Sequence, residues 1–300
     1  MSRIAYVNGR YVPHRRGMVH IEDRGYQFAD GVYEVVAIAD GRLIDDGPHL
    51  DRLERSLREL RIAPPMPRRA LELVMREVIR RNGVQNGIIY VQMTRGVAPR
   101  DHAFPAKPRT QVVMTARRSR PPSSKVAEEG VKVVTLPDIR WGRCDIKSIS
   151  LLPNILAKQT AKEAGAYEAW LVDRNGMVTE GSSSNAWIVT RDGKLVTRSI
   201  ENAILAGITR QTVIALAREE GVELVERPFT VAEAKAAREA FVTSSSSLVT
   251  PVTQIDDQVV ANGRPGSVSA KLRERYLRYM AGEAISAGER PSASSSAASG

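Results

Sequence analysis

The stretch that decides the fold reads WGRCDIKS over residues 141–148, and its companion reads VTEGSSSN over residues 178–185. The first places Lys147 in a short non-helical segment, and the second places Glu180 at the end of an apolar strand. A buried lysine amine is the usual protein group for holding an aldehyde covalently. A carboxylate that faces a pyridine nitrogen keeps that ring protonated, so that the ring can take up the electrons of a carbanion. Neither residue is informative alone, because most lysines are solvated and many carboxylates lie in loops; the two together are.

The size and composition of the chain indicate a globular protein. Its 300 residues suit one large or two medium domains, and 42% apolar with 26% charged residues is ordinary for such proteins. No apolar run approaches the roughly 20 residues that cross a bilayer, and the N-terminus lacks the apolar core of a signal peptide. The single cysteine, Cys144, excludes an intrachain disulfide and fits a reducing compartment. We therefore expect a cytoplasmic protein with no membrane contact.

The formal net charge of +10 raises the question of nucleic-acid binding. The basic residues are interspersed with acidic ones, as in DRLERSLRE over residues 51–59, which is typical of a solvated helix face. Aromatic residues make up only 5% of the chain, so there is little for bases to stack on. We expect no nucleic-acid partner, and a positive field that gathers small anionic substrates.

The hydrophobic pattern predicts an α/β chain in two parts. In the first part, Asn8-Gly9 and Asp40-Gly41 are hairpin signals between apolar runs. Helical spacing predicts helices over residues 50–60 and 67–81, and strands are expected over 88–93 and 111–115. The sequence SRPPSS over residues 119–124 is typical of a linker. We therefore expect an N-terminal α/β domain over residues 1–118.

The second part also alternates strands and helices. Strands are expected over residues 131–136, 168–172, 185–189 and 240–243, and helices over 153–164, 208–220, 231–236 and 268–280. This pattern predicts a second α/β domain over residues 125–286. The remaining residues, 287–300, are rich in Ser and Ala and too polar to order themselves, so we expect a disordered tail.

A phosphate group needs several hydrogen-bond donors and preferably the start of a helix. The expected helix that begins at Ile208 follows Gly207, which lets the backbone approach, and Thr209 adds a hydroxyl in the first turn. Arg52 is a candidate cationic partner, although at this spacing it could equally be a surface charge. Ser244 and Ser245, after the last expected strand, offer further donors. The serines of residues 182–184 are suited to surround a cofactor with hydrogen bonds.

Over about residues 3–280, these pieces stand in the order found in the fold-type IV aminotransferases, which the chain resembles. The resemblance implies two domains, the N-terminal one smaller and the C-terminal one larger with a barrel-like sheet. It also implies pyridoxal 5'-phosphate bound to Lys147, with Glu180 at the pyridine nitrogen and Arg52 at the phosphate. Leu205 falls where the family packs a leucine against the ring. No metal site is expected.

The nearest branch of the family acts on D-amino acids, and two further motifs carry this part of the resemblance. The run EDRGYQFADGVYE over residues 22–34 implies that Tyr33 lies at the substrate. The run TRGVAPRDH over residues 94–102 implies that Arg100 and His102 hold the α-carboxylate, for which an arginine fork is the best side-chain match. The resemblance implies that this loop reaches into the site of a neighbouring subunit, so that a homodimer is needed.

The expected reaction is transamination between a broad range of D-amino acids and 2-oxo acids, with D-alanine and 2-oxoglutarate giving pyruvate and D-glutamate. The rivals within the fold are a branched-chain L-aminotransferase, an (R)-amine transaminase and aminodeoxychorismate lyase. Tyr33, Arg100 and His102 argue against all three, because each handles the carboxylate differently or has none. A basic, anion-binding protein without catalytic activity is a remote alternative.

Overall fold

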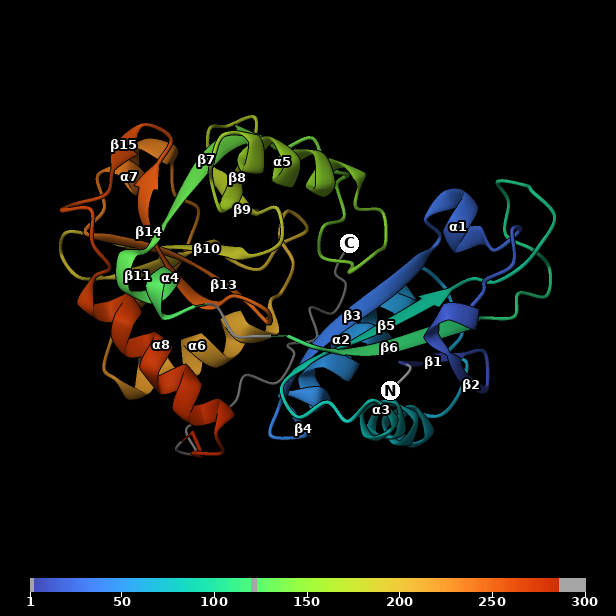
Figure 1. Ribbon diagram of the computed structural model, residues 1–300. Helices are drawn as coiled ribbons and strands as arrows, with labels where there is room; N and C mark the ends of the chain where they lie inside the picture. The colour runs from blue at the N-terminus through green and yellow to red at the C-terminus, as the bar shows by residue number, and fades with distance from the viewer. Residues whose placement is uncertain (1–2, 120–122, 286–300) are drawn as a thin grey trace, which may run out of the picture.

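The computed structural model describes residues 3–119 and 123–285, which form two sheets with helices packed on them (Figure 1). The first sheet has six antiparallel strands in the order β2-β1-β6-β5-β3-β4. Its strands are β1 (Ile4–Val7), β2 (Arg10–Pro13), β3 (Gly31–Ala39), β4 (Arg42–Leu43), β5 (Gly87–Thr94) and β6 (Gln111–Arg118). The helices of this half are η1 (His14–Arg16), α1 (Arg24–Phe28), α2 (Asp46–Glu59) and α3 (Arg68–Asn82).

Both predicted hairpins are confirmed. The β1–β2 turn holds Asn8 at φ 47° and Gly9 at φ 92°, and the β3–β4 turn holds Asp40 at φ 49° and Gly41 at φ 74°. Two successive residues with positive φ define the turn whose twist matches that of the flanking strands, which is why Asn-Gly and Asp-Gly favour it.

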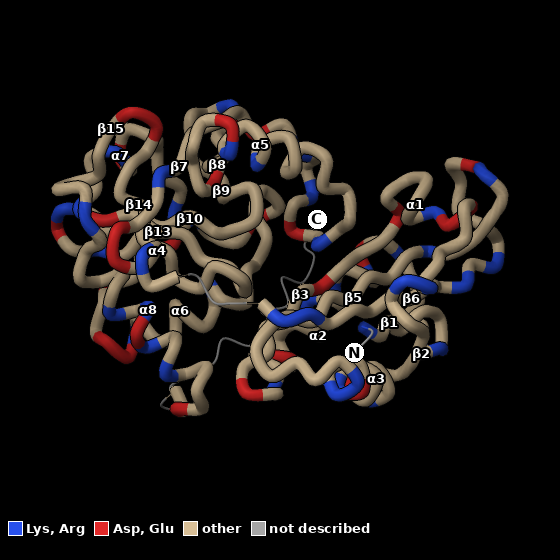
Figure 2. Tube along the Cα trace, in the orientation of Figure 1, with Lys and Arg blue, Asp and Glu red and all other residues tan. Residues whose placement is uncertain are grey.

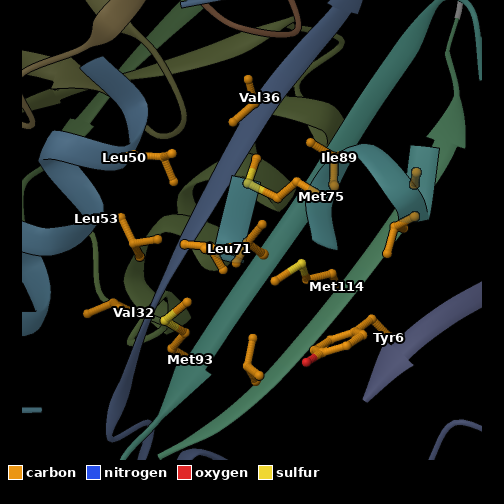
Figure 3. Close-up of a cluster of buried hydrophobic side chains, with 14 of the residues drawn as sticks. Tyr6, Val32, Val36, Leu50, Leu53, Leu71, Met75, Ile89, Met93 and Met114 are labelled. Atoms are coloured by element: carbon orange, nitrogen blue, oxygen red, sulfur yellow. The ribbon is translucent and has the colours of Figure 1, made fainter. Parts of the chain in front are cut away.

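Helices α2 and α3 cover one face of the first sheet, and the hydrophobic core of this half lies between the helices and the sheet (Figure 3). Because side chains alternate along a strand, Val32 and Val36 of β3 point into this core, where Leu53 of α2 is also buried. Burying a leucine or valine side chain of this kind stabilises the fold by about 1.5–3 kcal/mol. The same alternation sends Tyr33 and Val35 to the opposite face, where the candidate site lies.

The second sheet has nine strands, in the order β12-β11-β10-β13-β14-β7-β8-β9, with β15 paired to β14. It curls, so that β9 contacts β10, and this agrees with the barrel-like sheet that the family resemblance implies. Its strands are β7 (Val131–Pro137), β8 (Glu168–Val172), β9 (Val178–Gly181), β10 (Asn185–Val189), β11 (Leu195–Thr197), β12 (Leu224–Glu226), β13 (Glu239–Ser244), β14 (Leu248–Ile255) and β15 (Gln258–Val259). Its helices are α4 (Ser124–Glu129), α5 (Leu152–Glu163), α6 (Ile208–Glu219), α7 (Val231–Lys235) and α8 (Ser267–Met280).

The two halves of the molecule contact each other at two places. After β7 the chain crosses to the edge of the first sheet, where Ser148 bridges to Val32. At the start of α2, Asp45 accepts hydrogen bonds from Thr212 of α6 at 2.9 Å and from Tyr279 of α8. Basic and acidic residues are interspersed along both halves (Figure 2).

Most expected elements are present, with small shifts at their ends. Helix α2 begins at Asp46, four residues before the expected start, because the apolar spacing that signals the helix begins only at Leu50. Helix α4 was not expected: it begins at Ser124, the last residue of the expected linker, and Ser123 caps it. The tail expected over residues 287–300 lies outside the described residues. Among the described helices, none combines the length and the hydropathy needed to cross a membrane.

Candidate active site

A cleft of about 220 Å³ lies between the two halves and collects most of the predicted site residues. Its lining includes the residues expected to hold the cofactor, together with the expected substrate tyrosine. These are Tyr33, Arg52, Lys147, Glu180, Leu205, Ile208, Thr209, Ser244 and Ser245. Among the described residues that line the cleft, Arg100 and His102 are not found.

Lys147 is held at the cleft by its backbone. Its N–H donates to Oγ of Ser56 on α2 at 3.2 Å, and its carbonyl accepts from the N–H of Tyr33 at 3.0 Å. The side chain is half-buried, and its Nζ lies 4.3 Å from the centroid of the Tyr33 ring. The first half of the molecule therefore fixes the backbone of Lys147, and the Lys147 amine lies against the face of a tyrosine ring.

Glu180 is the penultimate residue of β9, with only 5% of its surface exposed. Its carboxylate pairs with Arg140, accepts from Nδ2 of Asn185 at 3.0 Å, and accepts from the N–H of Leu205 at 3.2 Å. Burial raises the pKa of Glu180 above its ordinary value, while the charge and hydrogen bond of Arg140 work against that shift. Arg140 in turn donates to Asp138 at 2.7 and 2.9 Å. A chain of alternating charges, from Asp138 through Arg140 to Glu180, thus supports the carboxylate.

The sequence reasoning missed Arg140. It lies 40 residues from Glu180 along the chain, and no local pattern connects a residue that follows β7 with one in β9. Its position beside Asp138 resembles an ordinary surface ion pair in the sequence. Only the folded sheet, in which β7 and β8 are parallel neighbours and β9 is the next strand, brings the two together.

The start of α6 also lines the cleft. Gly207 is its N-cap and provides no side chain, so the first N–H groups of this twelve-residue helix have no side-chain cap. A Cβ on Gly207 would lie 2.0 Å from Oδ1 of Asn185, which excludes any larger residue here without movement. Thr209 in the first turn is 3% exposed. A helix start of this kind, with a neighbouring hydroxyl, suits an anionic phosphate.

Arg52 is buried rather than solvated, and its guanidinium points across to this helix start. Its Nε and Nη2 each donate to Glu34 at 2.8 Å, and Nη1 donates to the carbonyl of Ala206 at 2.8 Å. A guanidinium has five N–H donors, so Nη1 keeps a second hydrogen for a ligand. Glu34 also contacts Nδ1 of His49 at 2.8 Å. Burial alone would raise the pKa of Glu34, but Arg52 and His49 hold it well below its usual range.

Glu34 was also absent from the predicted site, although the sequence held a signal for it. It follows Val32 and precedes Val36 on the face of β3 that is packed against α2. A carboxylate at such a position must find a cationic partner, because an unpaired buried charge costs several kcal/mol. Arg52, on the helix that covers this face, is that partner.

The two serine-rich turns differ in how they use their hydroxyls. Ser182, Ser183 and Ser184 line the cleft, and their hydroxyls donate to Glu168, which is 1% exposed. In the other turn, Oγ of Ser244 lies 2.6 Å from Oγ of Ser247. Ser244, Ser245 and Ser246 line the same cleft as the first turn of α6.

Arg100 and His102 lie on the exposed loop between β5 and β6, beside α1 and at the end of the first sheet that points away from the second (Figure 1). The Arg100 guanidinium lies 4.5 Å from the centroid of the Phe28 ring, and the ring of His102 lies 5.4 Å from the same ring. The structure therefore brings both residues to the Phe28 ring, and neither is among the described residues that line the cleft of their own chain.

The donor set of the cleft fits a phosphorylated pyridine aldehyde. It offers an amine at Lys147, a buried carboxylate at Glu180, and a helix start with a guanidinium and hydroxyls for a phosphate. Lys147 and Glu180 come from different segments of the second half of the chain, while Arg52 comes from α2 in the first half. The arrangement can hold an aldehyde covalently and keep a pyridine nitrogen protonated.

Known proteins resemble this chain over most of its length. A family model described as amino-transferase class IV matches residues 31–255. The D-alanine aminotransferase of Staphylococcus haemolyticus is 40% identical over 275 residues, which cover 92% of this chain and 97% of that protein. The D-alanine aminotransferase of Bacillus licheniformis is 41% identical over 266 residues, which cover 89% of this chain and 93% of that protein.

Solved structures share the fold at lower sequence identity. A T.th. branched-chain amino acid aminotransferase, solved with pyridoxamine 5'-phosphate, superposes with a TM-score of 0.86 at 27% identity, over 93% of this chain and 94% of that chain. The branched-chain aminotransferase of Thermoproteus uzoniensis with norvaline gives a TM-score of 0.84 at 28% identity, over 93% and 95%.

Proposed function

This chain belongs to the class IV aminotransferases, whose cofactor is pyridoxal 5'-phosphate, and from that premise we propose that it transfers amino groups between D-amino acids and 2-oxo acids. The proposed pair is D-alanine with 2-oxoglutarate, giving pyruvate and D-glutamate, within a broad range of D-amino acids. The single cysteine, Cys144, supports a cytoplasmic location. The observation that carries the proposal is the meeting of Lys147, Glu180 and the start of α6 in one cleft.

We assign the cofactor-holding roles by chemistry. Lys147 would bind the aldehyde carbon, Glu180 would face the pyridine nitrogen, and Leu205 would pack against the ring. The phosphate would be held by Arg52, by Ser244 and Ser245, and by the first turn of α6 with Ile208 and Thr209. Bound in this way, the cofactor supplies an electron sink for the carbanion formed at the substrate α-carbon. Once the amino group of the donor has replaced it at the aldehyde carbon, the freed Lys147 amine would take up and return the α-proton.

Arg140 and Asn185 act on Glu180. The positive charge of Arg140 opposes the rise that burial causes in the pKa of Glu180, and it therefore favours the ionised carboxylate, the form that would accept a hydrogen bond from a protonated ring nitrogen. Asn185 and the N–H of Leu205 also donate to the carboxylate and fix its orientation. This is the pre-organised charge that a developing carbanion requires.

The substrate carboxylate is bound by Tyr33 and by the partner subunit's Arg100 and His102, in a homodimer. Two observations support this arrangement: in one chain the loop lies away from the cleft, and the surface around α1 is apolar. Met18 is 80% exposed, Ile21 75% and Tyr26 75%, which is costly in a monomer and typical of a surface covered by another subunit.

A branched-chain L-aminotransferase is the second candidate, because solved structures with that name share the fold closely. Their identity of 27–28% is well below the 40–41% of the D-alanine enzymes. The loop with Arg100 and His102 also favours a D-amino acid substrate, since it presents the carboxylate so that the α-hydrogen of the D-isomer faces Lys147.

The handedness of the donor tests the proposed function. In single turnovers, D-alanine should convert the bound cofactor to its amino form faster than L-alanine or L-leucine by on the order of 10²-fold or more, because a misplaced α-hydrogen loses productive geometry. The absorbance of the cofactor follows the conversion directly. A faster reaction with L-leucine or L-valine would assign the chain to the branched-chain enzymes instead.

A mixed dimer tests whether Arg100 and His102 act across the interface. Lys147→Ala and Arg100→Ala chains carrying different tags are combined, and the hybrid is isolated through both tags. If the loop serves the neighbouring site, one site of the hybrid carries both defects and the other carries none, so activity returns. The matched control combines Lys147→Ala with Glu180→Gln, two changes in the same cleft, and should recover nothing. Without recovery in the first hybrid, the loop would act within its own chain.

A further inference from the structure

Behind the loop that carries Arg100 and His102 lies a buried ion cluster that the cofactor cleft does not use. The carboxylate of Asp30, 11% exposed, accepts from Nε of Arg24 at 2.8 Å and from Nε and Nη2 of Arg95 at 2.7 and 2.9 Å. Burial alone would raise the pKa of Asp30, but the hydrogen bonds from Arg95 and Arg24 hold it below its usual value. Arg24 and Arg95 are only 3% and 2% exposed.

The remaining donors of Arg24 point at the loop. Its Nη1 donates to the carbonyl of Asp101 at 2.5 Å and to that of Ala103 at 3.2 Å, and its Nη2 donates to the carbonyl of His102 at 3.3 Å. Three successive carbonyls of an otherwise irregular, exposed loop thus converge on one buried guanidinium. Their alternative partner is water, which would leave the loop free to take other conformations.

The side chains of Arg24, Arg100 and His102 also meet, at the ring of Phe28. The guanidinium of Arg24 lies 4.8 Å from the centroid of the Phe28 ring, and Arg100 lies 4.5 Å from it. The ring of His102 contacts the same phenyl group. Both proposed carboxylate ligands therefore rest on a ring that Arg24 also contacts, so a shift of Arg24 moves both.

Arg95 fixes the far side of the cluster. It donates to the carbonyls of Leu60 and Arg61 at 2.7 and 3.0 Å, and its guanidinium stacks 3.6 Å from the centroid of the Phe104 ring. Asp30 joins this fixed arginine to Arg24. The loop is therefore held at residues 101–103 by one arginine and at Phe104 by the other, with one carboxylate between them.

We propose that Arg24 is a positioning residue for the substrate-carboxylate site, holding Arg100 and His102 in the geometry with which they meet the carboxylate. The inference rests on the proposed role of those two residues. A binding group must be held within about 0.5 Å and 10–20° of the geometry in which it meets its ligand. Arg100 and His102 lie on a loop, so no helix or strand holds them in that geometry. Arg24, supported by Asp30 and Arg95, does so by fixing the carbonyls of the loop.

Arg24→Lys is the informative variant. Lysine keeps a positive charge near Asp30, but its point charge cannot serve one carboxylate and three carbonyls at once. In the holoenzyme we expect KM for D-alanine to rise on the order of tenfold to hundredfold, with the affinity for pyridoxal 5'-phosphate unchanged. The equilibrium Kd for propionate, a carboxylate that cannot react, should rise by the same factor in calorimetric titrations. Arg198→Lys, which changes a buried arginine paired with Asp173 outside the cleft, is the matched control and should change neither constant.

A double-mutant cycle separates positioning from general destabilisation. If Arg24 acts through the loop, Arg24→Lys should add less than about twofold to the propionate Kd in an Arg100→Ala background, because coupled residues are not additive. Equal effects in both backgrounds, or no effect of Arg24→Lys on its own, would overturn the inference. If instead Arg100→Ala left the propionate Kd unchanged, the proposed role of Arg100 itself would fail. Should Arg24→Lys not fold, Phe28→Leu, which removes the shared ring, is tested in the same cycle with the same outcomes.

Discussion

Replacing Lys147 with alanine should abolish transamination and leave the fold intact. The lost amine is both the covalent anchor of the cofactor and the carrier of the α-proton, so we expect turnover to fall by several orders of magnitude. The fold should survive because both local hydrogen bonds of this residue, to Ser56 and from Tyr33, are made by its backbone. Turnover of D-alanine with 2-oxoglutarate and the thermal unfolding midpoint are the two measurements.

Lys158→Ala is the control for this experiment. Lys158 lies in the middle of α5, where its amine donates to the carbonyl of Tyr167 and lies 3.3 Å from Glu168, so its role is structural. This variant should keep its activity. If Lys147→Ala were as active as Lys158→Ala, a different group would have to anchor the cofactor.

Replacing Glu180 with glutamine should slow removal of the α-proton far more than it weakens cofactor binding. A neutral amide cannot keep the pyridine nitrogen protonated, and losing a charge aimed at the reacting system costs on the order of 10²–10³ in rate. The cofactor should stay bound, because its phosphate contacts lie elsewhere, at α6 and Arg52. Arg140 keeps its bonds to Asp138, so the local fold should hold.

Two measurements on the Glu180→Gln protein decide the matter. The single-turnover rate with α-deuterated D-alanine should show a larger isotope effect than in the unchanged enzyme, since proton removal becomes limiting. A titration with pyridoxal 5'-phosphate should give nearly the same Kd. A variant that lost the cofactor but turned over normally once saturated would assign Glu180 to binding alone.

Local patterns in the sequence were enough to predict most of the fold. Asn8-Gly9 and Asp40-Gly41 specify their turns through backbone conformation, and the helices follow from apolar spacing, because both signals act over a few residues. Glu180 was correctly expected at the end of a strand and Lys147 in a non-helical segment. That these two face one cleft was implied by the family resemblance and not by any spacing.

The ion pairs that support the site could not be predicted in the same way. Arg140 with Glu180 and Arg24 with the carbonyls of residues 101–103 join segments 40 or more residues apart. Their partners are fixed by strand order and by burial, which sequence spacing does not record. The serines of residues 182–184 illustrate the same limit, since the buried Glu168 on a neighbouring strand takes the hydroxyls that the local sequence suggested for a ligand.

Helix α2 couples the unfolding of the two halves of the molecule. Asp45, at its start, is bonded to α6 and α8, and Arg52, two turns later, is bonded to the carbonyl of Ala206 in the same distant half. Separating the halves would leave Arg52 and Glu34 exposed at a broken surface and would open the phosphate site at the same moment. We therefore expect the two sheets to unfold together in a single transition, even though each half has its own core.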